Sequence, residues 1–134
     1  MKVGDCIKMP TPGNKIPHPW FVVADKPDGS CVIVNMTTLG HVCDKTVILH
    51  KDEHPTVLHD SIILYSDAQI TTLETLDLLV SRGAASKQDA CSPDFLKKIQ
   101  EGIAKSPETR IYVLNFCGIN VPKTANPPAR PPRR

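Results

Sequence analysis

The sequence lacks the long apolar run that a membrane-spanning helix needs. Its apolar runs are only a few residues long, such as residues 62–65, whereas a spanning helix takes about 20. The N-terminus also lacks the basic-then-apolar pattern of a signal peptide. A chain of 134 residues suits one compact domain and is too short for two. We therefore expect a soluble, cytoplasmic protein with no membrane contact.

Paired cysteines and aromatic ladders are also missing. The five cysteines are odd in number, lie far apart and form no C-x-x-C pair, which is typical of free buried thiols in a reducing compartment. Aromatic residues make up 4% of the chain, with a single tryptophan, so no series of rings is available to stack successive bases. The cysteines are Cys6, Cys31, Cys43, Cys91 and Cys117.

A large net charge is also missing, and the charge is unevenly placed. The net charge is +2, but four of the sixteen basic residues and none of the fourteen acids lie in residues 122–134. Residues 1–121 therefore carry a net charge of −2. This argues against coating nucleic acid by bulk electrostatics, although a local basic groove stays possible.

The first two-thirds of the chain is typical of short strands joined by turns. Brief stretches rich in Val and Ile are bounded by Gly, Pro and Asp. The segment 26–29 is a turn sequence, Lys-Pro-Asp-Gly, and predicts a hairpin between its flanking strands. Prolines at 10 and 12 predict a loop over residues 10–15. The expected strands are 4–9, 20–24, 31–36, 46–50 and 61–65.

Helical signals begin only at Thr71. The segment 71–74 offers a capping box, and an apolar stripe follows until Gly83 stops the helix. A second helix is predicted from the Ser92 cap, with proline at its first position. The segment 110–116 is predicted to be a last strand or extended segment.

The expected fold is mainly β or α+β: a small, SH3-like antiparallel barrel followed by C-terminal helices. Residues 1–120 would form one domain. Five of the thirteen prolines fall in residues 122–134, so we predict a disordered Pro/Arg-rich tail over residues 121–134. An arm that contacts RNA or a partner is the alternative for this tail.

Four short motifs, in this order, carry a resemblance. They are Gly4-Asp5-Cys6-Ile7, His18-Pro19-Trp20-Phe21-Val22-Val23, Asn35-Met36-Thr37-Thr38 and Ser61-Ile62-Ile63-Leu64. Over roughly residues 3–105 the chain resembles the MazF/PemK family of toxin ribonucleases from bacterial toxin–antitoxin modules. It departs from the family pattern at His18, where an Arg is usual, and at Asn35, where a Pro is usual. The pair His54-Pro55 between two strands and the segment 110–116 after the helix are also outside the pattern.

The resemblance implies a function and a set of residues. It implies cleavage of single-stranded RNA by attack of the 2′-hydroxyl without metal or cofactor, in a homodimer inhibited by a small antitoxin protein. Carried over position by position, it places His18, Thr37 and Ser61 in the catalytic centre and Thr38 on the RNA. From the sequence alone, threonines at a strand end are more often structural.

Chemistry adds further candidates. A metal-independent ribonuclease needs a base, an acid and donors for the phosphate oxygens, and histidine suits both proton roles near neutral pH. His54 lies in a polar loop, where site residues tend to sit, and is hypothesised to pair with His18 as acid and base. Lys15 and Lys51 are candidate phosphate-binding residues, although loop lysines are usually just solvated.

Two other classes of function stay open. A barrel of this kind also suits a non-catalytic binding module that acts as an adaptor or as an inhibitor of a larger protein. A small metal-binding regulator would use Cys43 with His50, His54 and His59, but their spacing fits no standard zinc pattern. We therefore predict no metal site.

Overall fold

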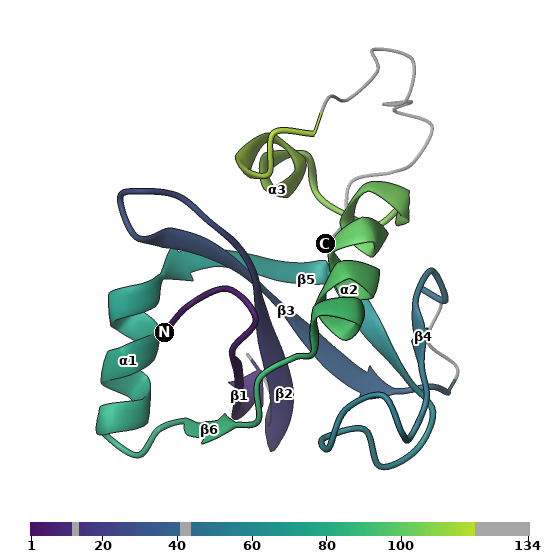
Figure 1. Ribbon diagram of the computed structural model, residues 1–134, viewed down its shortest axis with the longest axis horizontal. Coiled ribbons are helices and arrows are strands. Elements are labelled where there is room, and N and C mark those ends of the chain that lie inside the picture. The colour runs from purple at the N-terminus through teal and green to yellow at the C-terminus, as the bar shows by residue number, and fades with distance from the viewer. Residues whose placement is uncertain (12–13, 41–43, 120–134) are drawn as a thin grey trace.

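The computed structural model describes residues 1–11, 14–40 and 44–119 as an antiparallel sheet with three helices (Figure 1). The sheet has six strands in the order β4-β5-β3-β2-β1-β6 and is curled into a half-barrel. This confirms the expected mainly β or α+β class and fits a small SH3-like barrel. The elements are β1 Cys6–Thr11, β2 Asn14–Asp25, β3 Ser30–Thr38, β4 Ile48–Leu49, β5 Ser61–Thr72, α1 Leu73–Ser81, β6 Ser86–Gln88, α2 Pro93–Lys105 and α3 Ile111–Phe116.

The hairpin between β2 and β3 forms where the turn sequence predicts it. Lys26 N donates to Ser30 O at 2.9 Å, and Gly29 N donates to Lys26 O at 2.9 Å. Gly29 has a φ of +88°, a left-handed conformation that glycine adopts without strain. The predicted pairing of 46–50 with 61–65 is also confirmed, although β4 is only two residues long and β5 continues to Thr72.

The prolines after the first strand do not end it, so the loop predicted over residues 10–15 is wrong. β1 continues to Thr11, β2 begins at Asn14, and Pro10 lies opposite Pro17. Proline is tolerated in a strand where no neighbour needs its N–H. β6 pairs only with the first three residues of β1, 6–8. On the β6 side of Pro10, therefore, no described strand requires the N–H that proline lacks.

Pro19 sets the point where β2 and β3 separate. Val22 N donates to Asp5 O at 3.0 Å, and hydrogen-bonded pairs recur every second residue along an antiparallel ladder. The N–H of Val22 thus points to β1, and the missing N–H of Pro19 would point to β3. The ladder between β2 and β3 accordingly ends at Trp20 and Asn35, one residue before Pro19 would have to donate.

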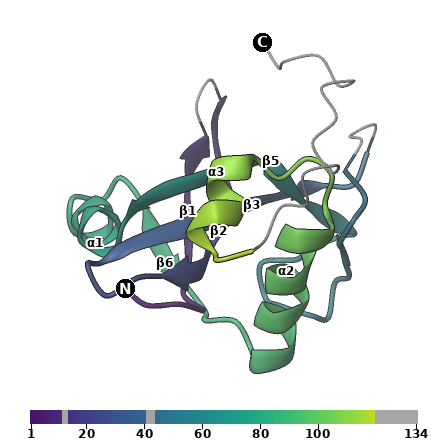
Figure 2. The ribbon, with the colours of Figure 1, turned by 90° about the horizontal axis from the view of Figure 1, so that it is seen from above.

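Each face of the sheet carries its own helix and its own core. The α1 face packs Ile7, Trp20, Val22, Cys31 and Ile33 against Leu76 of α1. The α2 face is larger and includes Phe21, Val34, Ile63 and Tyr65 against Phe95, Ile99 and Ile103 of α2. Figures 1 and 2 both show α1 and α2 at opposite ends of the curled sheet.

The two predicted helices form, but the first begins at a different cap, and a third helix forms where a strand was predicted. Ser92 caps α2, as predicted, by accepting from Phe95 N at 3.2 Å. The cap of α1 is Thr72 rather than Thr71, because Thr72 Oγ1 accepts from Thr75 N at 3.0 Å. The segment 110–116 is not a strand: Ile111–Phe116 forms α3, with Val113 buried. The predicted tail lies outside the described residues, and no described helix is long and apolar enough to cross a membrane.

Four cysteines are free thiols, as expected, and Cys43 lies outside the described residues. Burial, with a smaller effect from the charge of Asp25, raises the pKa of Cys31 to about 11. Burial, assisted by Asp5, also raises the pKa of Cys91 to about 11. The folded state therefore favours the neutral thiols.

Stability should consequently fall in alkali. The unfolded thiols ionise near their ordinary pKa of 9.0, while these folded thiols hold their protons to about 11. Their contribution is fully present below pH 9 and is lost as the pH rises toward 11. We expect a lower urea midpoint at pH 10.5 than at pH 8, and a smaller difference in a Cys31→Ala/Cys91→Ala variant. Equal pH dependence in both proteins would contradict this assignment.

Candidate functional site

Three buried polar atoms on the α1 face have no hydrogen-bond partner among the described residues. They are Nδ1 of His18, Nε1 of Trp20 and Oδ1 of Asn35. The side chains of Trp20 and Asn35 are 1% and 2% exposed, and His18 is half-buried. Native proteins pair nearly all buried polar atoms, and an unpaired one costs about 1–3 kcal/mol. Three such atoms on neighbouring strands are therefore a candidate ligand site.

Strand alternation brings these residues to one face. His18 and Trp20 are two residues apart on β2, and Asn35 lies directly opposite Trp20 on β3. Thr37 follows two residues after Asn35 in a regular part of β3. His18 and Thr37 thus share the α1 face. They lie just past Trp20 and Asn35, the last pair of the β2–β3 ladder, where these two strands separate. We call His18, Trp20, Asn35 and Thr37 the polar cluster.

The polar cluster combines groups that suit phosphodiester chemistry. An imidazole can accept or donate a proton near neutral pH. The indole N–H donates only, whereas the amide of Asn35 and the hydroxyl of Thr37 both donate and accept. An imidazole beside several donors can move a proton while the donors hold an anionic oxygen.

The unpaired amide oxygen should make Asn35 a stability cost. Replacing Asn35 by leucine removes a buried amide oxygen that has no partner among the described residues and keeps a similar volume, so the free energy of unfolding should rise by about 1 kcal/mol. Urea denaturation measures this change. The same substitution at the exposed Asn115 should change stability by much less. A destabilised Asn35→Leu variant would show that the amide has a partner in solution.

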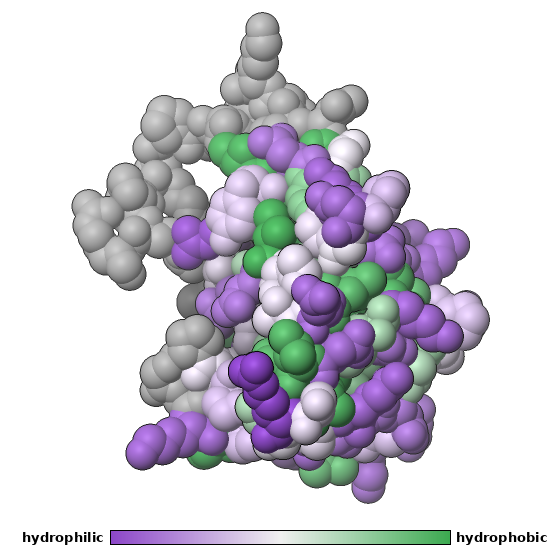
Figure 3. Space-filling model, turned by 90° about the vertical axis from the view of Figure 1, so that its left-hand side faces the viewer, coloured by the Kyte–Doolittle hydropathy of each residue, from purple (hydrophilic) through white to green (hydrophobic). Residues whose placement is uncertain are grey.

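An uncharged groove lies beside the polar cluster, between α1 and the β1–β2 hairpin. Its volume is about 520 Å³. Figure 3 looks at this side of the molecule and shows hydrophobic patches among hydrophilic side chains. The groove is lined by Met9, Pro10, Thr11, Trp20, Ile33, Gln69, Thr71, Thr75, Leu76, Leu79 and Ala84.

His54 does not join His18. It is 4% exposed and packs on the α2 face, with ring centroids 5.5 Å from Phe21 and 5.1 Å from Phe95. Its Nδ1 accepts from Thr56 N at 3.1 Å, which leaves Nε2 to donate to Asp89 O at 2.8 Å. The two histidines lie on opposite faces of the sheet, so the structure does not form the hypothesised acid–base pair.

These contacts predict a structural effect for His54. Replacing it by alanine removes a ring packed between two phenylalanines and leaves Asp89 O and Thr56 N without their partner. We expect a loss of about 3 kcal/mol in unfolding free energy, measured by urea denaturation. His59→Ala is the matched control, because His59 is exposed and its ring makes one hydrogen bond to the rest of the described chain, with Thr38. Equal stability of the two variants would contradict this role.

Ser61 and Thr38 also lie on the α2 face. They are paired residues of β5 and β3, in register with the buried Ile63 and Met36 of that face. Ser61 is 3% exposed and donates to His59 O at 2.8 Å. Thr38 Oγ1 and His59 Nε2 are 2.7 Å apart. Of the four predicted catalytic residues, the structure therefore brings only His18 and Thr37 to one face.

The predicted phosphate-binding lysines are not placed together by any contact. Lys15 lies on β2 and Lys51 lies in the loop after β4. Both side chains are exposed. No hydrogen bond or ion pair between described residues involves the side chain of either lysine.

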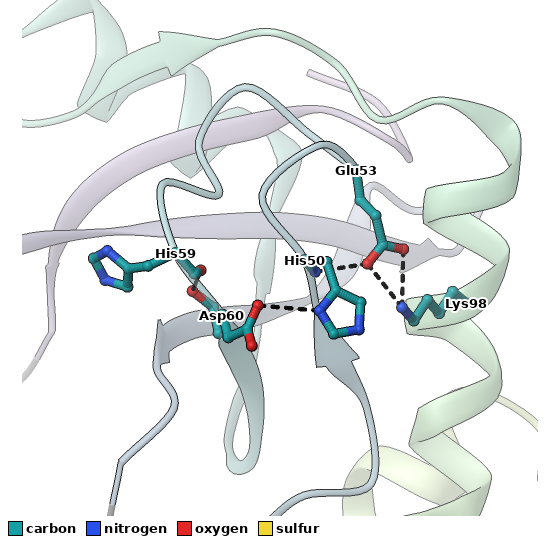
Figure 4. A network of polar contacts seen from close by, with 6 residues as sticks. His50, Glu53, His59, Asp60 and Lys98 are labelled. Atoms are coloured by element: carbon teal, nitrogen blue, oxygen red, sulfur yellow. Dashed lines mark hydrogen bonds and ion pairs between the residues drawn. The ribbon is translucent and has the colours of Figure 1, made fainter.

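The histidines of the 50–60 loop belong to separate polar contacts. His50 Nδ1 lies 3.0 Å from Asp60 Oδ1, and Glu53 binds Lys98 of α2 at 2.8 Å (Figure 4). Partial burial alone would raise the pKa of Glu53, but bonds from Lys98 and the His50 amide outweigh it and lower that pKa. Within 1–11, 14–40 and 44–119, no group of three or more His, Cys, Asp or Glu is placed to hold a metal ion.

Comparison with protein-family models and with curated proteins finds no match to this chain. The site is therefore assigned from its geometry. Sequence reasoning named His18 and Thr37 but gave Trp20 and Asn35 no role in the site. The signal that could have found both is their period-two spacing from His18 and Thr37 along their strands, which places all four on one face.

Proposed function

We propose that this protein is an endoribonuclease that cleaves single-stranded RNA without a metal. The observation that carries the proposal is the set of unpartnered buried atoms of His18, Trp20 and Asn35 on the face that also holds Thr37. A folded protein keeps such atoms at a cost in stability. An RNA phosphate offers an acceptor for Trp20 Nε1, and its 2′-hydroxyl offers a donor for His18 Nδ1.

In the proposed reaction, His18 removes the proton from the 2′-hydroxyl. The 2′-oxygen attacks the adjacent phosphorus and displaces the 5′-oxygen, which leaves a 2′,3′-cyclic phosphate on one fragment. The displaced 5′-oxygen takes a proton from water or from a protonated imidazole. Trp20, Asn35 and Thr37 donate hydrogen bonds to the phosphate oxygens, where negative charge develops.

The resemblance to the MazF/PemK toxins supports the same reaction and adds partners. On that basis we propose a cytoplasmic toxin that acts as a homodimer and is inhibited by a small antitoxin. The alternative function, a non-catalytic binding module, draws support from the uncharged groove beside the polar cluster. A module of that kind would not need an imidazole at the edge of its groove.

The test is to incubate the purified full chain with a long single-stranded RNA in EDTA and to map the ends. We expect discrete cuts that carry 2′,3′-cyclic phosphates. A parallel reaction with a 2′-deoxy substitution at a mapped site should not be cut there, because the nucleophile is missing. A folded protein that leaves the RNA intact at high concentration would overturn the proposal and favour a binding module.

A further inference from the structure

The groove beside the polar cluster has a buried apolar floor. Trp20, Ile33 and Leu76 line it and are each 1% exposed. The half-buried side chains of Met9 on β1 and Leu79 on α1 also line it, and no charged side chain does. Its volume of about 520 Å³ lies within the range of small-ligand sites, about 300–1,000 Å³. The groove therefore suits a neutral and largely apolar ligand rather than a phosphate or an ammonium group.

One amide in the lining offers this ligand a specific contact. The side chain of Gln69 is half-buried and makes no hydrogen bond with any other described residue. The hydroxyl of Thr75, which also lines the groove, is different because it accepts from Thr72 Oγ1 at 2.8 Å. An amide carries a donor and an acceptor side by side. A ligand with an acceptor next to a donor along one edge would satisfy both groups of Gln69.

A nucleobase is a flat ligand with such an edge. Glutamine binds adenine through two hydrogen bonds, whereas guanine is usually bound by Arg or Lys and cytosine by Glu or Asp. An unpaired RNA base leaves these edges open to a protein. Because the groove has an amide and no charge in its lining, adenine is the base that it matches. The N6 amino group would donate to Oε1 of Gln69, and the neighbouring ring nitrogen would accept from Nε2.

The sheet places Gln69 near the polar cluster. Ile33 pairs with Gln69 of β5 and lies two residues before Asn35 on β3. These steps measure about 4.8 Å across a sheet and about 6.6 Å along a strand. Trp20 belongs to both the groove lining and the polar cluster. A base bound at Gln69 would therefore bring the adjacent RNA phosphate to the polar cluster.

We propose that the groove binds an unpaired adenine base of single-stranded RNA, with the amide of Gln69 bound to the edge that carries the N6 amino group. Gln69 is then a specificity-determining residue, because it selects the base that lies beside the cleaved phosphate. The inference rests on the proposed ribonuclease function for the source of the base. Binding of the base can be measured without cleavage, so the two proposals can fail separately.

The single tryptophan reports on the groove in the full chain. Incorporating 5-fluorotryptophan gives one ¹⁹F resonance, from the groove floor at Trp20. The probe is a short single-stranded RNA of uridines with one adenosine, and its 2′-O-methyl riboses prevent cleavage. We expect the adenosine RNA to bind about 10-fold or more tightly than the same RNA with guanosine in that place. The same loss is expected with purine riboside, which lacks the N6 amino group.

Substitutions of Gln69 test the contact itself. Gln69→Leu should abolish the preference for adenine and keep the fold, because the amide makes no hydrogen bond within the described chain. Gln69→Glu keeps the shape but cannot donate to the ring nitrogen, and it should shift the preference toward cytosine, whose amino group donates to a carboxylate. Gln88→Leu is the matched control, because Gln88 is half-buried and lines a different hollow. It should keep the wild-type preference.

Equal affinity for the three RNAs, or a Gln69→Leu variant that keeps the adenine preference, would overturn the inference. A preference for guanosine would also overturn it and would move base recognition to Arg110 in the adjoining hollow. Free adenosine that binds as tightly as the RNA would make the groove a nucleoside site instead. None of these three results affects the proposed cleavage. Adenine binding that depends on Gln69, in a protein that cuts no RNA, would support the base site and overturn only the ribonuclease function.

Discussion

Replacing Gly102 by alanine should lower the free energy of unfolding by about 3 kcal/mol, because the new methyl group overpacks the core. An added Cβ would collide with Tyr65 Oη and would lie 2.6 Å from both Tyr65 Cζ and Val47 Cγ2. In an ordinary helix position, the same change stabilises by up to about 1 kcal/mol. The sign of the effect therefore reports on how closely α2 approaches the sheet.

The buried tyrosine explains why this contact cannot relax cheaply. Tyr65 Oη donates to Ile99 O at 2.8 Å, on the same face of α2 as Gly102. Moving the ring away from a new methyl group would break that bond in a buried site. Burial first, and then the charge of Asp44, raise the pKa of Tyr65 well above its usual value, so the hydroxyl remains a donor.

The measurement is urea denaturation of Gly102→Ala beside two further proteins. Glu101→Ala, an exposed neighbour on the same helix, should be within about 0.5 kcal/mol of the wild type. Adding Tyr65→Phe to Gly102→Ala should recover part of the loss, because it removes the atom closest to the new methyl group. A Gly102→Ala variant as stable as the wild type would show that α2 lies farther from the sheet in solution.

Patterns that depend on a few neighbouring residues were predictable from the sequence. The Lys-Pro-Asp-Gly turn and the Ser92 cap each need only local geometry, and both form as expected. The periodicity of α1 and α2 also predicted their buried faces. The same local reasoning predicted that Pro10 ends its strand, and this was wrong. A missing N–H is costly only where a neighbouring strand would accept its hydrogen bond, and the local sequence does not show where the neighbouring strands end.

Short elements were the least predictable. β6 is the polar tripeptide Ser86–Gln88, and only its pairing with β1 makes it a strand. Residues 111–116 form an apolar run that suits either a strand or a buried helix turn. They become helical with Val113 in the core, while Ile111 and Tyr112 stay 44% and 51% exposed.

In the candidate site too, positions that depend on local geometry were predictable and positions that depend on tertiary packing were not. His18 and Thr37 reach one face because period-two alternation is a local property of strands. His54 had the composition of a site residue, a histidine in a polar loop, and yet its ring fills a gap between two phenylalanines. Its burial depends on how the loop folds over the sheet, which no motif around residue 54 encodes.

His18→Ala should reduce RNA cleavage by about 10²–10⁴-fold, the usual contribution of a general acid or base. The folded domain should keep its stability, because His18 Nδ1 has no partner in the described chain that would be lost. Initial rates of cleavage at a mapped site, together with urea midpoints, measure both effects. An effect on cleavage without an effect on stability is what separates a proton-transfer residue from a structural one.

The three variants His18→Ala, His54→Ala and His59→Ala form one matched set. His59→Ala should leave both cleavage and stability near wild type, and His54→Ala should lower stability through the α2 face. Added imidazole should restore part of the cleavage by His18→Ala, because it replaces the missing base in solution, and it should not help the Thr37→Ala variant, which still has its imidazole. Full cleavage by His18→Ala would remove the imidazole from the reaction. The polar cluster would then bind RNA or another ligand without proton transfer at residue 18.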